Sequence, residues 1–295
     1  MLAKYTPSGA FTSRLFVGAP VVLAGTAALG AVYQLITHYV PFIKAHLLIA
    51  ILMCFAIVVL VRQLAKTAHC RNRLLGTSLG VVAGLVAITV SHYVEYELSR
   101  PGLIASVPPA QRAAVDAHFG FIQFLEFRVE TGWTLGHGSS TSSGSGDISG
   151  VGVYVCWGIE ALLILISAGI GGYRAASAPY CEQCGTWATH DMLRVETPQP
   201  SADLVAGVRS ARELDQLFPP ASSVGSGIQG DISLLRYSVT SCPTCKMTHT
   251  LKVEHQQVTV TGKKTEKKKH VLHDKVVLTS EEVGRLAQLK GVPVS

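Results

Sequence analysis

Four long apolar stretches constrain the fold of this chain more than any other feature of its sequence. They cover residues 15–36, 45–61, 74–94 and about 151–173. A helix needs about 20 mostly apolar residues to cross a bilayer, and in lipid the chain must pair its own backbone polar groups. The sequence therefore predicts four transmembrane helices. The first is expected to be retained, because its apolar run exceeds the apolar region of a cleaved signal peptide.

Charged residues are few and unevenly distributed. They make up 15% of the chain, against about 25% in an ordinary soluble domain. Residues 1–173 carry 17 of them and residues 174–295 carry 27. This composition excludes a disordered chain, a coiled coil and a collagen-like chain. We expect an α-helical polytopic membrane bundle at 1–173, followed by a small cytoplasmic α+β domain at 174–295.

Basic residues near the span ends predict the orientation. Four of them, Arg62, Lys66, Arg71 and Arg73, crowd the short loop between the second and third spans. Because such clusters stay on the cytoplasmic side, both termini are expected in the cytoplasm. The four predicted spans make the lipid bilayer the expected partner. Compact size and this topology are typical of a bacterial inner-membrane protein, which is the expected location.

Glycines repeat every four residues along the third span, at Gly76, Gly80 and Gly84. This spacing places three positions without side chains on one helix face, where another backbone can approach closely. The stripe is interpreted as packing within the protein's own bundle, with a dimer interface as the alternative.

A long segment at 95–147 is expected on the far side of the membrane. Three prolines, at positions 101, 108 and 109, interrupt its start, and residues 110–130 predict one helix with an aromatic centre. That helix is too short to span, so it is expected in the interface or against the bundle. Residues 136–150 have the composition of a flexible linker.

One carboxylate falls inside a predicted span. Glu160 lies about ten residues into the fourth span, where a charge costs about 2.5–3.5 kcal/mol. It is a candidate proton or ion relay, or a hydrogen-bonded structural carboxyl. His92, Glu95 and Glu97 gather at the outer end of the third span, and His38 lies at that of the first; they offer a weaker metal or proton site.

Two C-x-x-C pairs give the strongest chemical signal: Cys181 with Cys184, and Cys242 with Cys245. Two such pairs can bring four thiolates to one tetrahedral centre, and cytosolic thiols stay reduced. The prediction is a structural zinc ion, with iron as the chemical alternative. Four cysteine ligands leave no open position for a catalytic water.

The two pairs resemble the knuckles of zinc-ribbon and rubredoxin-type modules, and the resemblance covers the C-terminal knuckles and their flanks only. The chain departs from that pattern because 57 residues separate the pairs, against about 15–20 in a compact motif. Inside this insert, 202–217 predicts a helix and 234–240 a strand. Residues 248–261 and 270–278 predict two further strands.

A basic turn is expected between those last two strands, at 262–269. Its lysines are Lys263, Lys264, Lys267, Lys268 and Lys269. They are candidates for contact with anionic lipid, with a solvated hairpin tip as the alternative. Nucleic acid is not an expected partner, because no aromatic platform accompanies the basic run. Thr279 and Glu282 form a capping box for a final helix at 280–290.

The pattern of residues contains no nucleophile–base pair, nucleotide loop or pair of carboxylates typical of an active site. The leading hypothesis is a non-enzymatic membrane scaffold or adaptor, as a subunit of a larger complex or as a homo-oligomer. One alternative is a small transporter or channel that uses Glu160. Another is a membrane thiol-redox protein that uses the cysteine pairs.

Overall fold

The computed structural model describes residues 2–40, 43–134, 147–198, 200–217, 231–261 and 264–289. Most of the predicted linker at 136–150 lies outside these ranges. The chain divides into two compact units: a helical unit, Gly9–Ser177, and a sheet unit that combines Met1–Ser8 with Ala178–Ser295. The sequence placed the boundary at 173 and 174 and assigned residues 1–8 to the helices.

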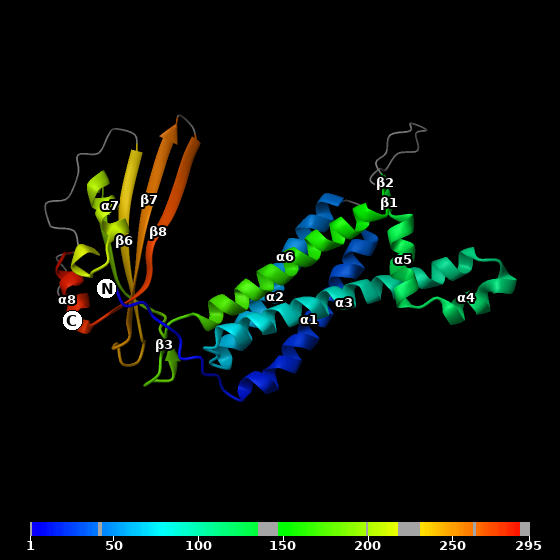
Figure 1. The fold of residues 1–295 in the computed structure, drawn as a ribbon, viewed down its shortest axis with the longest axis horizontal. Coiled ribbons are helices and arrows are strands. Elements are labelled where there is room, and N and C mark those ends of the chain that lie inside the picture. Colours follow the sequence, from blue (N-terminus) through cyan, green and yellow to red (C-terminus); the bar gives the residue numbers. More distant parts are fainter. Residues whose placement is uncertain are drawn as a thin grey trace. The chain divides into compact units, whose positions relative to one another are not determined.

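The helical unit is built on four long helices, shown in Figure 1. They are α1 (Arg14–Tyr39), α2 (Ile43–Thr67), α3 (Arg73–Ser106) and α6 (Val151–Ala176). Each contains a segment long and apolar enough to cross a membrane. The four predicted apolar helices are therefore confirmed as helices.

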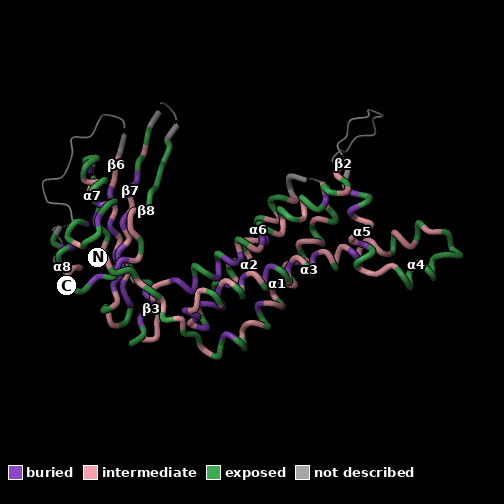
Figure 2. The backbone as a smooth tube through the Cα atoms, viewed as in Figure 1, coloured by how far each residue is buried: buried purple, intermediate pink, exposed green. Residues whose placement is uncertain are grey.

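The outer faces of these helices carry large exposed apolar side chains, whereas the buried residues in Figure 2 lie where the helices meet. Phe55 is 68% exposed and Leu162 is 58% exposed. Soluble proteins rarely expose contiguous apolar surface on this scale. The pattern is consistent with an integral membrane protein whose outer surface contacts lipid.

Small residues allow the helices to approach closely. A Cβ atom on Gly76 would lie 2.7 Å from the Gly172 carbonyl oxygen, and one on Gly80 would overlap the carbonyl of Ala168. Both contacts join α3 to α6. Gly84, also on α3, faces Ile164 of α6. The structure thus places the glycine stripe against a helix of the same chain.

The segment after the third span differs from the prediction in two ways. Helix α3 continues through Pro101 to Ser106, where a loop was expected. The single helix predicted at 110–130 is wrong: it is divided into α4 (Arg112–His118) and α5 (Phe121–Thr131). The chain breaks at Gly120, whose extended backbone starts α5 and whose N–H donates to Gln123 Oε1 at 3.1 Å.

The sheet unit contains a four-stranded antiparallel sheet in the order β5-β6-β7-β8. Its strands are β5 (His190–Pro198), β6 (Asp231–Ser241), β7 (His249–Thr261) and β8 (Lys264–Leu278). Helices α7 (Ala202–Ser210) and α8 (Ser280–Leu289) contribute to one core with the strands, which includes Leu235, Tyr237, Leu251, Val208 and Leu286.

Short elements complete the two units. They are the hairpin strands β1 (Trp133–Thr134) with β2 (Asp147–Ile148) and β3 (Tyr180–Cys181) with β4 (Thr186–Trp187), and the 3₁₀ turns Pro109–Gln111 and Asp215–Leu217.

The N-terminal residues pair with the free edge of β8. The Tyr5 N–H donates to the Lys275 carbonyl at 2.9 Å, and the Val277 N–H donates to the Ala3 carbonyl at 2.8 Å. Backbone hydrogen bonds of this kind protect an otherwise unpaired strand edge. They explain why residues 1–8 belong to the sheet unit although the helical unit follows them in the sequence.

The structure corrects two further predictions for the sheet unit. Strand β8 begins at Lys264, so the basic run is mostly strand and not a turn, because it pairs in register with β7. The helix predicted at 202–217 ends at Ser210. The capping box is confirmed, since Thr279 N donates to Glu282 Oε2 at 2.6 Å and Glu282 N donates to Thr279 Oγ1 at 3.3 Å.

The close approach of α3 to α6 can be tested with a pair of Gly→Ala substitutions. Gly80→Ala places a methyl group against the Ala168 carbonyl, so the free energy of unfolding should fall by roughly 1–3 kcal/mol. Gly158→Ala, on α6, has no atom within 4 Å of the added Cβ, and helix propensity makes it neutral or stabilising. Denaturation in detergent, followed by circular dichroism, measures both. Equal effects would contradict the packing described.

Candidate metal centre and polar cluster of the helical unit

The first cysteine pair lies in the tight hairpin between β3 and β4. Cys181 ends β3, and Gly185 directly follows Cys184 with φ of +65°. The Gly185 N–H donates to the Cys181 carbonyl at 2.9 Å. Glycine adopts this left-handed conformation without steric cost. The turn therefore directs both cysteines of the pair to one side of the hairpin.

The second pair lies in the connection from β6 to β7 and repeats this geometry. The Lys246 N–H donates to the Cys242 carbonyl at 3.1 Å, and Lys246 has φ of +55°. A left-handed conformation costs a non-glycine residue roughly 1–2 kcal/mol. The Cys242 N–H also donates to the Thr248 carbonyl at 3.1 Å, which closes the loop around the pair. Two independent loops thus adopt the same knuckle.

The two knuckles converge on one point. All four sulfur atoms of Cys181, Cys184, Cys242 and Cys245 lie within 4.8 Å of one another, and the Cys181 and Cys245 Sγ atoms are 3.6 Å apart. Four sulfurs placed about 2.3 Å from a tetrahedral zinc ion would be about 3.8 Å from one another. The donor set therefore fits one tetrahedral metal ion. We call these four residues the cysteine centre.

Hydrogen bonds around the cysteine centre favour thiolates at some positions. The Thr186 hydroxyl, 3.4 Å from Cys242 Sγ, and nearby backbone N–H groups lower the pKa of Cys242 to about 5. The Met247 N–H donates to Cys245 Sγ at 3.4 Å. In contrast, the hydrogen bond with Cys245 raises the pKa of Cys184 to about 12. Such a cluster becomes fully ionised when a cation neutralises its thiolates.

The nearby histidines have other contacts. His249 is buried, with its Nε2 atom 3.4 Å from Ser280 Oγ, and burial lowers its pKa. His255 Nε2 lies 2.8 Å from Ser233 Oγ. The cysteine centre consists of four cysteines, and a metal with four protein ligands has no position for a reacting water. It is suited to holding the fold.

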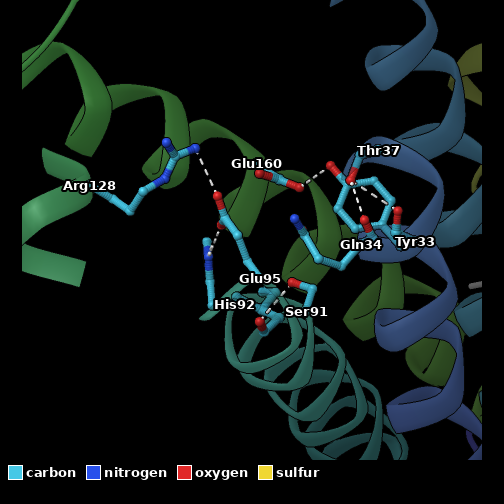
Figure 3. Close-up of polar contacts among 9 residues, drawn as sticks. Tyr33, Gln34, Thr37, Ser91, His92, Glu95, Arg128 and Glu160 are labelled. Carbon is cyan, nitrogen blue, oxygen red and sulfur yellow. Dashed lines mark hydrogen bonds and ion pairs between the residues drawn. The ribbon is translucent and has the colours of Figure 1, made fainter. Parts of the chain in front are cut away.

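A second set of polar groups lies within the helical unit and is shown in Figure 3. The Tyr33 hydroxyl of α1 donates to Glu160 Oε1 of α6 at 2.5 Å. This bond gives the carboxyl a neutral partner inside an apolar segment, where unpaired polar groups are costly. The sequence identified Glu160 but missed Tyr33, because the two residues are 127 positions apart.

His92 and Glu95 are neighbours on α3, in the half of that helix that is further from the loop at residue 70. Arg128, from α5, forms an ion pair with Glu95 at 2.8 Å, and His92 Nδ1 is 3.7 Å from the same carboxylate. The His92 ring packs edge-to-face on Trp157 of α6, with 5.0 Å between ring centroids. We call Tyr33, Glu160, His92, Glu95 and Arg128 the polar cluster.

The other residues proposed with these do not join the polar cluster. Glu97 is exposed on α3, and His38 packs edge-to-face on Tyr39, with 5.1 Å between ring centroids. Arg128 was the second residue that sequence reasoning missed. Its signal was that Arg128 is the one basic residue of the aromatic helix α5.

The predicted lysine site is only partly described. Lys263 lies outside the described residues, and of Lys264 only the backbone is described. Lys267, Lys268 and Lys269 are exposed on β8. Lys268 forms an ion pair with Glu266 at 3.2 Å, which reduces the positive charge of the strand at that point.

Comparisons with protein-family models, with curated proteins and with solved structures found no match for the chain. No characterised family therefore extends over its full length.

The cysteine centre predicts a metal content that mutation should change. The purified protein should contain about one zinc ion per chain. Cys245→Ser should remove this ion and make the sheet unit sensitive to protease, because a structural zinc ion supplies roughly 10–16 kcal/mol of apparent binding energy. Elemental analysis and limited proteolysis measure the two effects.

Cys156→Ser is the matched control, because Cys156 lies on α6 and outside the cysteine centre. It should keep the metal and the protease resistance of the wild type. Equal metal content in the two variants would contradict the assignment, and iron in place of zinc would revise the metal.

Proposed function

We propose that this protein is an integral membrane scaffold or adaptor, whose metal-stabilised sheet unit is the part that other subunits of a membrane complex bind. The observation that carries the proposal is the closed set of four cysteine ligands, because a metal centre without an open position stabilises a fold and performs no hydrolysis. The exposed apolar faces of the four long helices support insertion in lipid.

Both termini are proposed to lie on the cytoplasmic side. The N-terminal residues pair with β8, so the start of the chain and the sheet unit must share one side of the membrane. Four spans satisfy that requirement, because an even number of crossings returns the chain to its starting side. The basic loop between α2 and α3 supports the choice of side.

The adaptor proposal predicts a partner that depends on the metal. A protein that co-purifies with the wild type from native membranes at a fixed ratio should be lost from Cys245→Ser and kept by Cys156→Ser. Mild-detergent purification followed by quantitative mass spectrometry makes the comparison, with membrane insertion of each variant checked by alkaline extraction.

Two outcomes would overturn the adaptor proposal. One is a partner that binds both variants equally. The other is a disulfide within a cysteine pair that forms and breaks with added oxidant and reductant in metal-free protein; this result would favour the thiol-redox alternative.

A second candidate function, a small transporter or channel, is favoured by the polar cluster. Glu160 accepts its hydrogen bond from Tyr33 inside an apolar helix pair, and a carboxyl in this position is a default candidate for a proton or ion pathway. Glu95, with Arg128, provides a second carboxylate on a neighbouring helix.

Proton movement through the polar cluster should depend on the Glu160 carboxyl. In liposomes that hold a pH-sensitive dye, wild-type protein should let protons follow an imposed membrane potential, and Glu160→Gln should abolish this flux because an amide does not ionise at neutral pH. Tyr33→Phe, which removes the hydrogen bond and keeps the carboxyl, should retain flux. No flux in the wild type, or equal flux in Glu160→Gln, would eliminate this candidate.

A further inference from the structure

A pocket of about 360 Å³ lies between α7 and one face of the sheet. Ala202, Val205, Ala206 and Arg209 line it from the helix. Their spacing places them along one face of α7. The volume is within the range of about 300–1,000 Å³ that is usual for small-molecule sites.

The opposite wall of this pocket is polar. His255 on β7 and His270 on β8 are directly paired across the two strands, so their side chains share a face of the sheet. Ser233, on β6, also lines the pocket, and its hydroxyl oxygen is 2.8 Å from His255 Nε2. Gln257 adds an amide two residues along β7. Three strands and one helix therefore contribute polar groups to one small volume.

The charge of the pocket is of one sign. His255, His270 and Arg209 all line this one pocket, and burial, followed by the electrostatic effects of His270 and Arg209, lowers the pKa of His255. No Asp or Glu lines the pocket, and Arg209 forms no ion pair within the part of the chain that the structure describes. The nearest acidic residue on this face of β8, Glu266, binds Lys268. Arg209 and His270 are therefore available to a ligand.

We propose that this pocket binds the phosphate group of a small phosphate-bearing molecule. An Arg guanidinium offers a planar fork of N–H donors that matches phosphate oxygens, and the hydroxyl and imidazole groups add donors from the sheet. The apolar wall formed by Ala202, Val205 and Ala206 has room for an organic part, because the pocket is several times larger than a phosphate ion. The site is separate from the cysteine centre and independent of the adaptor proposal.

Two sources could present this phosphate: a soluble phosphomonoester or the headgroup of a lipid. Titration of the purified full-length protein with orthophosphate and with dihexanoyl phosphatidic acid, at constant ionic strength, distinguishes them. Similar affinity for both indicates a soluble ligand, and binding at least about tenfold tighter to the lipid indicates a headgroup.

Substitution of the pocket residues tests the site directly. Arg209→Gln and His270→Gln should each weaken binding of the better probe about tenfold or more, as expected when a charge-assisted hydrogen bond is lost. Arg212→Gln is the matched control, because Arg212 is exposed, lies three residues further along the chain and does not line this pocket. It should bind like the wild type.

Three results would overturn the proposal. They are no saturable binding of either probe by calorimetry, unchanged affinity in both pocket variants, and equal losses in the pocket variants and Arg212→Gln. The protease resistance of each variant, measured on the same samples, shows whether the sheet unit has kept its fold, so that loss of binding reports on the pocket itself.

Discussion

The helical unit depends on the close approach of helix backbones at small residues. Lipid tails are as apolar as apolar side chains, so moving such a side chain from lipid into a helix contact gains little free energy. Helices in a bilayer therefore associate through van der Waals packing and buried polar contacts. Gly76 against Gly172 and Gly80 against Ala168 provide the first of these. The Tyr33–Glu160 hydrogen bond joins α1 to α6 and provides the second. Large apolar side chains are left for the outer faces.

The sheet unit is stabilised differently, because it has a water-excluding core. Leu235, Tyr237 and Leu251 are buried between the sheet and its helices, and this burial is the main stabilising term in a soluble domain. The β3–β4 hairpin lies outside that core, and two-residue strands are too short to be stable alone. The four sulfur atoms bring this hairpin and the β6–β7 connection together, so a metal ion bound there would add most to its stability.

One electrostatic rule applies to the polar cluster, to the cysteine centre and to the pocket beside α7. A partly buried charge needs an opposite charge or a hydrogen-bond partner. In the polar cluster the protein supplies the partners itself, with Arg128 for Glu95 and Tyr33 for Glu160. The cysteine centre gathers four sulfur donors, whose thiolate forms a cation would stabilise. The pocket beside α7 gathers Arg209 and two histidines, which favour an anion. The proposed metal site and the proposed phosphate site would therefore take ligands of opposite charge within one unit.

The sequence by itself determined the four apolar helices, the two cysteine knuckles and the cap formed by Thr279 and Glu282. Each of these depends on residues within one segment, where composition and spacing act directly. The break at Gly120 and the early end of α7 were missed, because helix ends depend on local backbone geometry that neighbouring propensities do not fix.

Only the tertiary structure decided which distant residues meet. Tyr33 and Glu160, Arg128 and Glu95, and Arg209 with the paired His255 and His270 come from separate elements. The pairing of residues 3–5 with β8 likewise joins the two ends of the sequence. Such contacts depend on how helices pack and on how strands align in register, and one sequence carries no local signal for either.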